Sequence, residues 1–153
     1  MSGSDPERAF RQTGWPGPGA RLFHAYFGLR RPMTLGVRGL VPARAANSVL
    51  LVRHTYVPGW QLPGGGVETG ETMEEALARE MAEEGNIALT ASPVLRSMHF
   101  NRQASRRDHV GFYLIEGFRQ AAPRSADGEI AEAGFFALDA LPGPEQPDFG
   151  VTL

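Results

Sequence analysis

Residues 65–87 read GGVETGETMEEALAREMAEEGNI and decide the fold of this chain, because a glycine-rich turn is followed there by a helix rich in glutamate. An α-helix turns once in about 3.6 residues, so side chains three and four positions apart lie on one face. We therefore expect Glu80, Glu83 and Glu84 to point the same way. Such like charges repel one another unless they are protonated, widely hydrated or neutralised by a cation. A hard, oxygen-seeking ion such as Mg²⁺ suits them best, and Mg²⁺ commonly completes its coordination with substrate phosphate oxygens.

The segment before the helix supplies bare backbone and a defined helix start. Glycine presents no side chain, so the sequence WQLPGGG at residues 60–66 can bring main-chain groups close to a metal and its substrate. The carbonyl of Gly64 is a candidate metal ligand there. Thr72 followed by Glu75 predicts a capping box, which fixes where the helix begins. Glu75 also lies four residues before Arg79, and this spacing predicts an ion pair along the helix. The apolar side of the helix consists of Met73, Ala76, Leu77 and Met81.

The segment resembles the Nudix box, which reads glycine, five residues, glutamate, seven residues, arginine-glutamate, an apolar residue, one residue, glutamate-glutamate, one residue, glycine and an apolar residue. One position departs from that pattern, because Asn86 stands where the family usually has its last glycine. Asparagine tolerates the left-handed conformation that ends helices, so we expect the cap to form and activity to be kept. The matching positions are Gly65, Glu71, Arg79, Glu80, Met81, Glu83, Glu84 and Ile87.

The resemblance implies a fold, a reaction and a role for each box residue. Nudix enzymes have a mixed, curved β-sheet between helices, and they hydrolyse a nucleoside diphosphate linked to another group. Glu80 and Glu84, followed by Glu83, are implied as catalytic ligands of Mg²⁺, for which Mn²⁺ is a possible substitute. Arg79 is implied to orient a carboxylate during catalysis. The structural positions of the box are Gly65 and Glu71, of which Glu71 is expected to brace the loop.

The general base of the implied reaction is left open by the sequence, because Nudix enzymes take it either from the box or from a glutamate on a later loop. Residues 127–132 read DGEIAE just before an expected strand, so Glu129 and Glu132 are the later candidates. The alternative for either side chain is a solvated turn glutamate.

Several other side chains are candidates for contact with the substrate. Arg38, Arg53 and His54 lie on or beside expected strands that precede the glycine turn, and the planar fork of arginine matches phosphate oxygens. The loop at residues 101–108 carries three arginines that could close on an anionic substrate. The candidate stacking partners for a base are Tyr56 and Trp60. The alternative for each is structural: an exposed strand residue, a solvated turn, or packing beneath the glycine turn.

Composition excludes several classes of protein. The chain has 153 residues, of which 42% are hydrophobic and 21% charged, which is enough for one folded domain and excludes disorder of the whole. A net charge of -2 gives no electrostatic footprint for non-specific binding to nucleic acid, although a local basic loop is possible. The Nudix resemblance implies a small-molecule diphosphate as the partner. Cysteine is absent, which removes disulfides and thiolate chemistry and fits a cytoplasmic location. No stretch approaches the roughly 20 apolar residues of a membrane span, and residues 1–19 lack a secretory signal pattern.

The remaining segments predict one mixed domain. We expect a flexible lead-in at residues 1–19, a single Nudix domain at residues 20–142 and a surface tail at residues 143–153. An amphipathic helix is expected at residues 20–30, and its aromatic face makes a homodimer reasonable. Further expected elements are strands at residues 33–41, 47–54, 94–100, 109–118 and 134–138, a turn at 42–46 and a short helix at 138–141. Strands both before and after the box helix predict an α/β or α+β sandwich.

Three alternatives to a hydrolase of small nucleotides remain. A Nudix-fold sensor would bind a nucleotide without turnover, although such modules tend to have degenerate boxes and this box is intact. An RNA 5′-end pyrophosphohydrolase would show a salt-sensitive affinity for long RNA. An isomerase of the isopentenyl diphosphate type resembles a chemistry that uses cysteine, which this chain lacks. The box itself does not specify the substrate.

Overall fold

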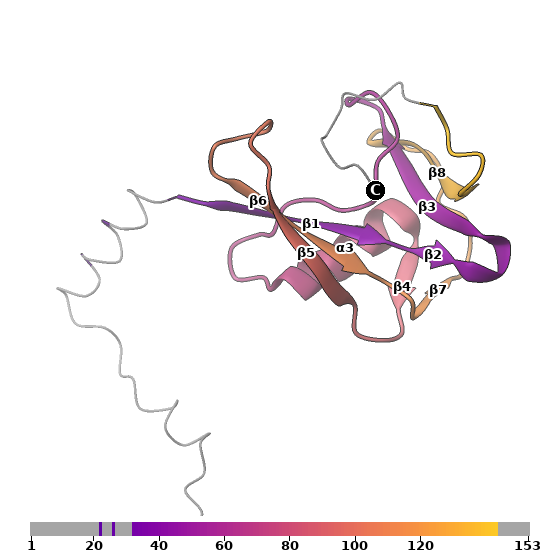
Figure 1. Ribbon diagram of the computed structural model, residues 1–153, viewed down its shortest axis with the longest axis horizontal. Helices are drawn as coiled ribbons and strands as arrows, with labels where there is room; N and C mark the ends of the chain where they lie inside the picture. The colour runs from indigo at the N-terminus through magenta and orange to yellow at the C-terminus, as the bar shows by residue number, and fades with distance from the viewer. Residues whose placement is uncertain (1–21, 23–25, 27–31, 144–153) are drawn as a thin grey trace, which may run out of the picture. The chain divides into compact units, whose positions relative to one another are not determined.

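The computed structural model describes residues 32–143 together with Leu22 and Tyr26 (Figure 1). The chain divides into two compact units, Met1–Pro32 and Met33–Leu153. Leu22 and Tyr26 of the first unit are exposed. The lead-in expected at residues 1–19, the rest of the helix expected at 20–30, and the tail expected beyond residue 143 lie outside the described residues. Within the described part, no helix is long and apolar enough to cross a membrane.

A mixed three-stranded sheet joins the first strand to two strands that follow the box helix. Strand β1 (Thr34–Leu40) pairs in parallel with β6 (Asp108–Leu114), and β5 (Val94–Phe100) pairs with β6 in the antiparallel sense. Figure 1 shows these strands beside helix α3 (Met73–Gly85), which contacts β1. The mixed α+β class predicted from the sequence is confirmed by this arrangement.

The other strands form two smaller antiparallel sheets. Strand β3 (Ser48–His54) lies between β2 (Pro42–Ala43) and β8 (Ile130–Ala137). Strand β4 (Ile87–Leu89) pairs with β7 (Phe118–Gln120) just beyond the end of α3. The described strands are therefore distributed over three sheets, whereas the resemblance implied one curved sheet.

The strand expected at residues 109–118 is two strands in different sheets. Strand β6 ends at Leu114, and the chain then turns at Gly117 before β7 begins. A Cβ atom at Gly117 would lie 2.5 Å from the side chain of Ala91, so the close approach of these two segments requires glycine. This contact between distant segments has no signature in the local alternation of residues.

Three further expectations also differ from the structure. The turn expected at residues 42–46 contains β2 and a short 3₁₀ helix, η2 (Arg44–Ala46). Strand β8 begins at Ile130, earlier than residue 134, because its first residues pair with the end of β3. The helix expected at residues 138–141 is only a turn, in which the amide of Ala140 donates to the carbonyl of Ala137. Pro142 follows it without an N–H group to continue a helix.

Helix α3 begins and ends as its sequence predicts. The side chain of Thr72 accepts from the Glu75 amide at 3.1 Å, and the Glu75 carboxylate accepts from the Thr72 amide at 2.8 Å. Asn86 adopts the left-handed conformation (φ 53°, ψ 37°) and its amide donates to the last helical turn. The predicted ion pair between Glu75 and Arg79 is wrong, because the capping box uses the Glu75 carboxylate and Arg79 binds other residues.

The apolar side of α3 fixes the helix against the sheets. Ala76, Leu77 and Met81 are fully buried and share one core cluster with Val37 and Leu50. Burial of a leucine side chain stabilises a fold by about 1.5–3 kcal/mol, so this face anchors the helix firmly. The glutamates on the neighbouring faces consequently have defined positions.

Candidate active site

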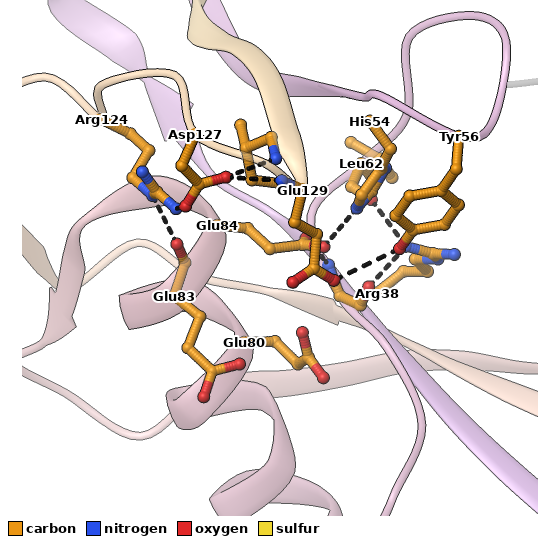
Figure 2. Close-up of polar contacts among 12 residues, drawn as sticks. Arg38, His54, Tyr56, Leu62, Glu80, Glu83, Glu84, Arg124, Asp127 and Glu129 are labelled. Carbon is orange, nitrogen blue, oxygen red and sulfur yellow. Dashed lines mark hydrogen bonds and ion pairs between the residues drawn. The ribbon is translucent and has the colours of Figure 1, made fainter.

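A polar hollow of about 330 Å³ lies between α3 and the segments opposite it. Its wall includes Arg38 of β1, His54 and Tyr56 at the end of β3, the glycine turn, α3, and the turn before β8. Figure 2 shows Glu80 and Glu84 on α3, Tyr56 and Arg38 on the opposite side, and Glu129 between them, reaching from its turn toward the helix glutamates. The acidic residues in the wall are Glu80, Glu84 and Glu129. The fold thus brings together residues that are far apart in the sequence.

Glu84 is the most firmly held carboxylate of the hollow. It is buried, its Oε1 lies 2.6 Å from Nε2 of His54, and its Oε2 accepts from the amide of Gly64 at 2.7 Å. His54 is also buried, and its Nδ1 has no hydrogen-bond partner among the described residues. The helix and the glycine turn are therefore joined through one side chain.

Glu80 lies beside the glycine turn and is half-buried. Burial is the main cause that raises the pKa of Glu80; the hydrogen bond from Arg79, 2.7 Å long, opposes it, and the charges of Glu84 and Glu83 add to it. A Cβ atom at residue 65 would lie 2.3 Å from Oε1 of Glu80, which gives a physical reason for Gly65 at that position. A side chain at residue 65 would therefore displace the Glu80 carboxylate from its place beside the glycine turn.

Glu83 does not line the hollow, although the sequence predicted that it would point with Glu80 and Glu84. Its side chain is 61% exposed and its carboxylate lies 3.6 Å from Arg79. The helical turn explains the difference, because residues 83 and 84 are separated by about 100° around the axis and flank residue 80 on opposite sides. Glu83 consequently lies at the solvent side of the acidic face.

Arg79 of α3 binds the loop that precedes the helix, which contains Gly66 and Glu71. Its guanidinium donates to both carboxylate oxygens of Glu71, at 2.9 and 3.0 Å, and to the carbonyl of Gly66 at 3.0 Å. The hydrogen bonds from Arg79 hold the pKa of Glu71 below its usual value. Because Arg79 also donates to Glu80, the loop, the arginine and the carboxylate of the hollow form one connected unit.

Arg38 reaches the glycine turn from β1. Its Nη1 donates to the carbonyls of Leu62 and Gly64, at 3.2 and 2.7 Å. The Gly64 carbonyl, which was a candidate metal ligand, therefore accepts a hydrogen bond here and keeps one further lone pair. The other N–H groups of Arg38 make no hydrogen bond within the described residues, and Arg38 is part of the wall of the hollow.

Glu129 faces the helix glutamates from the turn that precedes β8. Its Oε1 accepts a hydrogen bond from the hydroxyl of Tyr56 at 3.3 Å. Burial and the charge of Glu129 raise the pKa of Tyr56, so this hydroxyl stays protonated and remains a donor. The second later candidate, Glu132, lies outside the hollow and pairs with Arg53 at 3.1 Å.

Two residues that sequence reasoning missed support the turn that carries Glu129. Oδ1 of Asp127 accepts from the amides of Glu129 and Ile130, at 2.8 and 2.7 Å, and Oδ2 is paired with Arg124. Arg124 and these two amides hold the pKa of Asp127 well below its usual range. The Asp127-Gly128 pair is a turn signal that could have indicated this role, whereas Arg124 carries no local signal.

Arg53 and Trp60 lie together outside the hollow. The guanidinium carbon of Arg53 is 5.6 Å from the ring centroid of Trp60, and the Trp60 ring packs edge-on against Phe136 at 4.5 Å. The pairing of β3 with β8 is irregular between Arg53 and His54, and of these two residues only His54 lines the hollow. Arg53 and Trp60 do not line the hollow, so their contact with the substrate stays a prediction. The arginines of the basic loop are also absent from the wall of the hollow.

The oxygen ligands that the hollow offers are of the kind that Mg²⁺ prefers. Glu80 and Glu84 supply carboxylate oxygens, and the raised pKa of Glu80 indicates a charge that a cation would stabilise. Between residues 32 and 143, no three acidic or histidine side chains meet closely enough to enclose a metal ion by themselves. A partly open set suits Mg²⁺, because this ion keeps several waters and binds substrate phosphate oxygens.

Comparison with known proteins agrees with this arrangement. The NUDIX domain family matches residues 33–151, which is most of the chain. The chain belongs to the Nudix family. Among solved structures, a MutT NUDIX hydrolase from Burkholderia pseudomallei superimposes on this Nudix domain with a TM-score of 0.61 at 30% identity, covering 72% of this chain and 88% of that one. An ADP-ribose pyrophosphatase from Streptococcus suis shares the fold, with a TM-score of 0.54 at 22% identity over 71% of this chain and 77% of that one.

Curated relatives of this Nudix domain are named as hydrolases. The NAD-capped RNA hydrolase of Chromobacterium violaceum is 33% identical over 110 residues, which are 71% of this chain and 40% of that protein. The ADP-ribose pyrophosphatase of Methanocaldococcus jannaschii is 32% identical over 99 residues, which are 63% of this chain and 58% of that protein. The Nudix chain thus spans less than two thirds of the length of these relatives.

Proposed function

We propose that this chain is a Mg²⁺-dependent pyrophosphohydrolase that cleaves the phosphoanhydride of a nucleoside diphosphate linked to another group. One observation supports this function most directly: Glu80 and Glu84 of α3 face the same hollow as Glu129, with Arg38 at its wall. The hollow therefore combines carboxylates for a metal, a cation for phosphate and a separate carboxylate for water.

Glu80 and Glu84 would hold the metal ion, with Glu83 and the Gly64 carbonyl as further candidates. When bound, Mg²⁺ neutralises the diphosphate and lowers the pKa of the attacking water. His54 and the Gly64 amide hold the Glu84 carboxylate in one orientation, which reduces the cost of arranging it when the ion binds.

Arg38 would bind the diphosphate. Guanidinium has five N–H donors, and only Nη1 of Arg38 is used by the main-chain carbonyls. The remaining donors form a planar fork that matches two phosphate oxygens, and the contact with the glycine turn restricts the motion of the side chain.

Glu129 would accept a proton from the attacking water. Its Oε2 makes no hydrogen bond within the described residues, whereas Oε1 is occupied by Tyr56. The water oxygen forms a bond to phosphorus, the proton moves to Oε2, and the bond to the leaving phosphate breaks with its electron pair. Glu80, whose pKa is raised chiefly by burial, is the alternative base from the box.

The substrate class is best approached with a panel of diphosphates. The panel contains ADP-ribose, nucleotide sugars, dinucleoside polyphosphates, nucleoside triphosphates and NAD-capped RNA, each incubated with Mg²⁺ and then with Mn²⁺. We expect release of a monophosphate or phosphate from at least one member, and loss of that release when EDTA removes the metal. Absence of turnover for the whole panel would contradict the proposed activity.

A nucleotide sensor without turnover is the second candidate. It is favoured because both carboxylate oxygens of Glu84 already have a partner, the Gly64 amide on Oε2 and Nε2 of His54 at 2.6 Å from Oε1, and these contacts compete with metal binding. Calorimetry on the same panel separates the two functions. Binding of a nucleotide without product release would support the sensor.

An RNA 5′-end pyrophosphohydrolase is the alternative within the hydrolases. The observation that favours it is an exposed arginine on the hairpin between β5 and β6, where Arg102 lies 5.6 Å from the ring centroid of Phe100. An affinity for triphosphorylated RNA that falls steeply with salt, and exceeds the affinity for free nucleotide, would support this substrate.

We also propose that two copies of this chain form a homodimer. Exposed apolar side chains on β5, including Met98 and Phe100, offer a surface for a second copy. Sedimentation at several concentrations tests it, and a monomer at all of them would contradict it.

A further inference from the structure

The end of α3 that carries the acidic residues is bound by an arginine from a distant segment. Nε of Arg124 donates to the main-chain carbonyl of Glu83 at 2.6 Å. The last carbonyls of a helix have no partner within the helix, and a cation there also interacts favourably with the helix dipole. The last turn of α3 has no basic residue of its own, so Arg124 supplies this interaction from outside.

The same guanidinium holds the turn that carries Glu129. Its Nη2 pairs with Oδ2 of Asp127, and its Nη1 donates to the carbonyl of Ser125. Oδ1 of Asp127 in turn accepts from the amide of Glu129. Figure 2 shows this chain of contacts running from α3 through Arg124 and Asp127 to Glu129. One arginine therefore connects the helix that presents Glu80 and Glu84 to the backbone of the opposite carboxylate.

Other contacts reach the same region but not the same turn. Nε2 of Gln120 donates to the Gly85 carbonyl at 2.7 Å, and Nδ2 of Asn86 donates to the Ala122 carbonyl at 2.8 Å. These two contacts hold the segment before Arg124 against the helix end. On its other side, the turn is held by Thr55, whose amide donates to the Glu129 carbonyl at 2.9 Å. The link between α3 and the Glu129 turn itself runs through Arg124.

We propose that Arg124 and Asp127 are positioning residues that hold Glu129 at a fixed place opposite the carboxylates of α3. This inference rests on the proposed function, in which Glu129 accepts the proton. A displacement of a reacting group by about 1 Å can cost about 100-fold in rate, so a carboxylate on an exposed turn needs such support. Arg124 acts through the backbone of Glu129 and does not contact the substrate.

The test compares Arg124→Ala with Gln120→Ala. Both variants remove a side chain that binds a carbonyl at the end of α3, but only Arg124 contacts the Glu129 turn. Hydrogen exchange of the Glu129 amide is measured without substrate, and kcat and KM are measured on the best substrate of the panel. We expect Arg124→Ala to accelerate exchange and lower kcat about 10-fold while KM changes less than about twofold. Gln120→Ala should leave all three unchanged.

Asp127→Asn is the conservative companion variant. Its amide oxygen still accepts the amide of Glu129, while the ion pair with Arg124 is lost. We expect a smaller fall in kcat than in Asp127→Ala. A normal kcat together with unchanged exchange of the Glu129 amide in both Asp127 variants would overturn the proposal.

The Glu129→Gln background separates positioning from general structure. If Arg124 acts through Glu129, adding Arg124→Ala to Glu129→Gln lowers kcat no further, because the effects of residues that act as a unit do not add. The same loss in both backgrounds, or unchanged exchange of the Glu129 amide, would overturn the proposal. Faster exchange combined with a normal kcat of Glu129→Gln would instead place the failure in the proposed role of Glu129.

Discussion

The two walls of the hollow are built in different ways. On the wall formed by α3 and the glycine turn, residues 64–84 supply the carboxylates and the arginine that braces them. On the opposite wall, Arg38, Tyr56 and Glu129 come from three separate segments of the chain. Helical spacing positions the first wall, whereas strand pairing and one turn position the second. The difference teaches that spacing within one helix places the carboxylates of the first wall, with His54 as a distant contact of Glu84, whereas every member of the second wall is placed by long-range contacts.

Glu84→Gln should produce the largest effect, because it removes a charge from the locally built wall. The amide keeps one oxygen for the Gly64 amide but loses the negative charge that a divalent cation needs. We expect kcat with Mg²⁺ to fall about 1,000-fold, corresponding to several kcal/mol of lost stabilisation. Manganese affinity of the substrate-free protein, measured by calorimetry, should fall in parallel.

Glu83→Gln is the matched control for that variant, because Glu83 lies at the exposed side of the same helix face. Its loss should be about 10-fold or less. Equal losses of kcat in the two variants would mean that Glu83 contributes to the site as much as Glu84 does, and the first wall would then have to include Glu83.

Arg38→Lys should produce a smaller loss on the second wall. Lysine keeps the charge but lacks the fork that binds the Leu62 and Gly64 carbonyls together with phosphate. We expect kcat/KM to fall between about 10-fold and 100-fold, as for loss of a hydrogen bond to a charged group. A value of kcat/KM close to that of the unsubstituted protein would mean that phosphate binds elsewhere.

The first wall could be predicted from the sequence in detail. The capping box of Thr72, the left-handed Asn86 and the buried side of α3 all follow from spacing within one helix. The exception is Glu83. It is one residue before Glu84, and this difference around the helix axis leaves its side chain exposed to solvent instead of in the hollow. Helical spacing predicts which face of the helix carries a residue, but it does not predict which side chains on that face reach the hollow.

The second wall could be predicted only in part, because its contacts join residues far apart in the chain. Glu129 was marked by its turn, but the choice between Glu129 and Glu132 depends on how β8 pairs with β3. The same strands pair irregularly between Arg53 and His54, and His54 lines the hollow whereas Arg53 does not. Arg124 had no sequence signal, because its partner Glu83 lies 41 residues earlier.

Glu80 predicts a pH dependence of stability in the metal-free protein. Its folded-state pKa is raised above the ordinary value of 4.5, so the folded state binds the proton more tightly than the unfolded state. Stability must therefore fall as the pH rises from the unfolded pKa through the raised folded pKa. Denaturant unfolding across this range should show that slope, and Glu80→Gln should reduce it. The same slope in both proteins would show that Glu80 is not its source.

Arg53→Ala should have the smallest effect. Arg53 pairs with Glu132 and lies over Trp60, away from the hollow, and an exposed ion pair contributes about 0–1 kcal/mol. We expect kcat and KM to change less than about twofold, a change too small to resolve as a binding contribution. A KM raised tenfold or more would instead mean that the substrate extends over Trp60, and the second wall would have to include this cluster.

The most direct test of the two-walled site compares Glu129→Gln with Glu132→Gln in steady-state kinetics on one substrate with Mg²⁺. The two glutamates lie close in sequence, but only Glu129 faces the hollow, whereas Glu132 pairs with Arg53. A general base contributes about 100-fold or more, so kcat of Glu129→Gln should fall by at least about 100-fold. Glu132→Gln should remain within about twofold of the unsubstituted protein, because it loses only an exposed ion pair. A normal kcat in Glu129→Gln, or equal losses in both variants, would contradict the account.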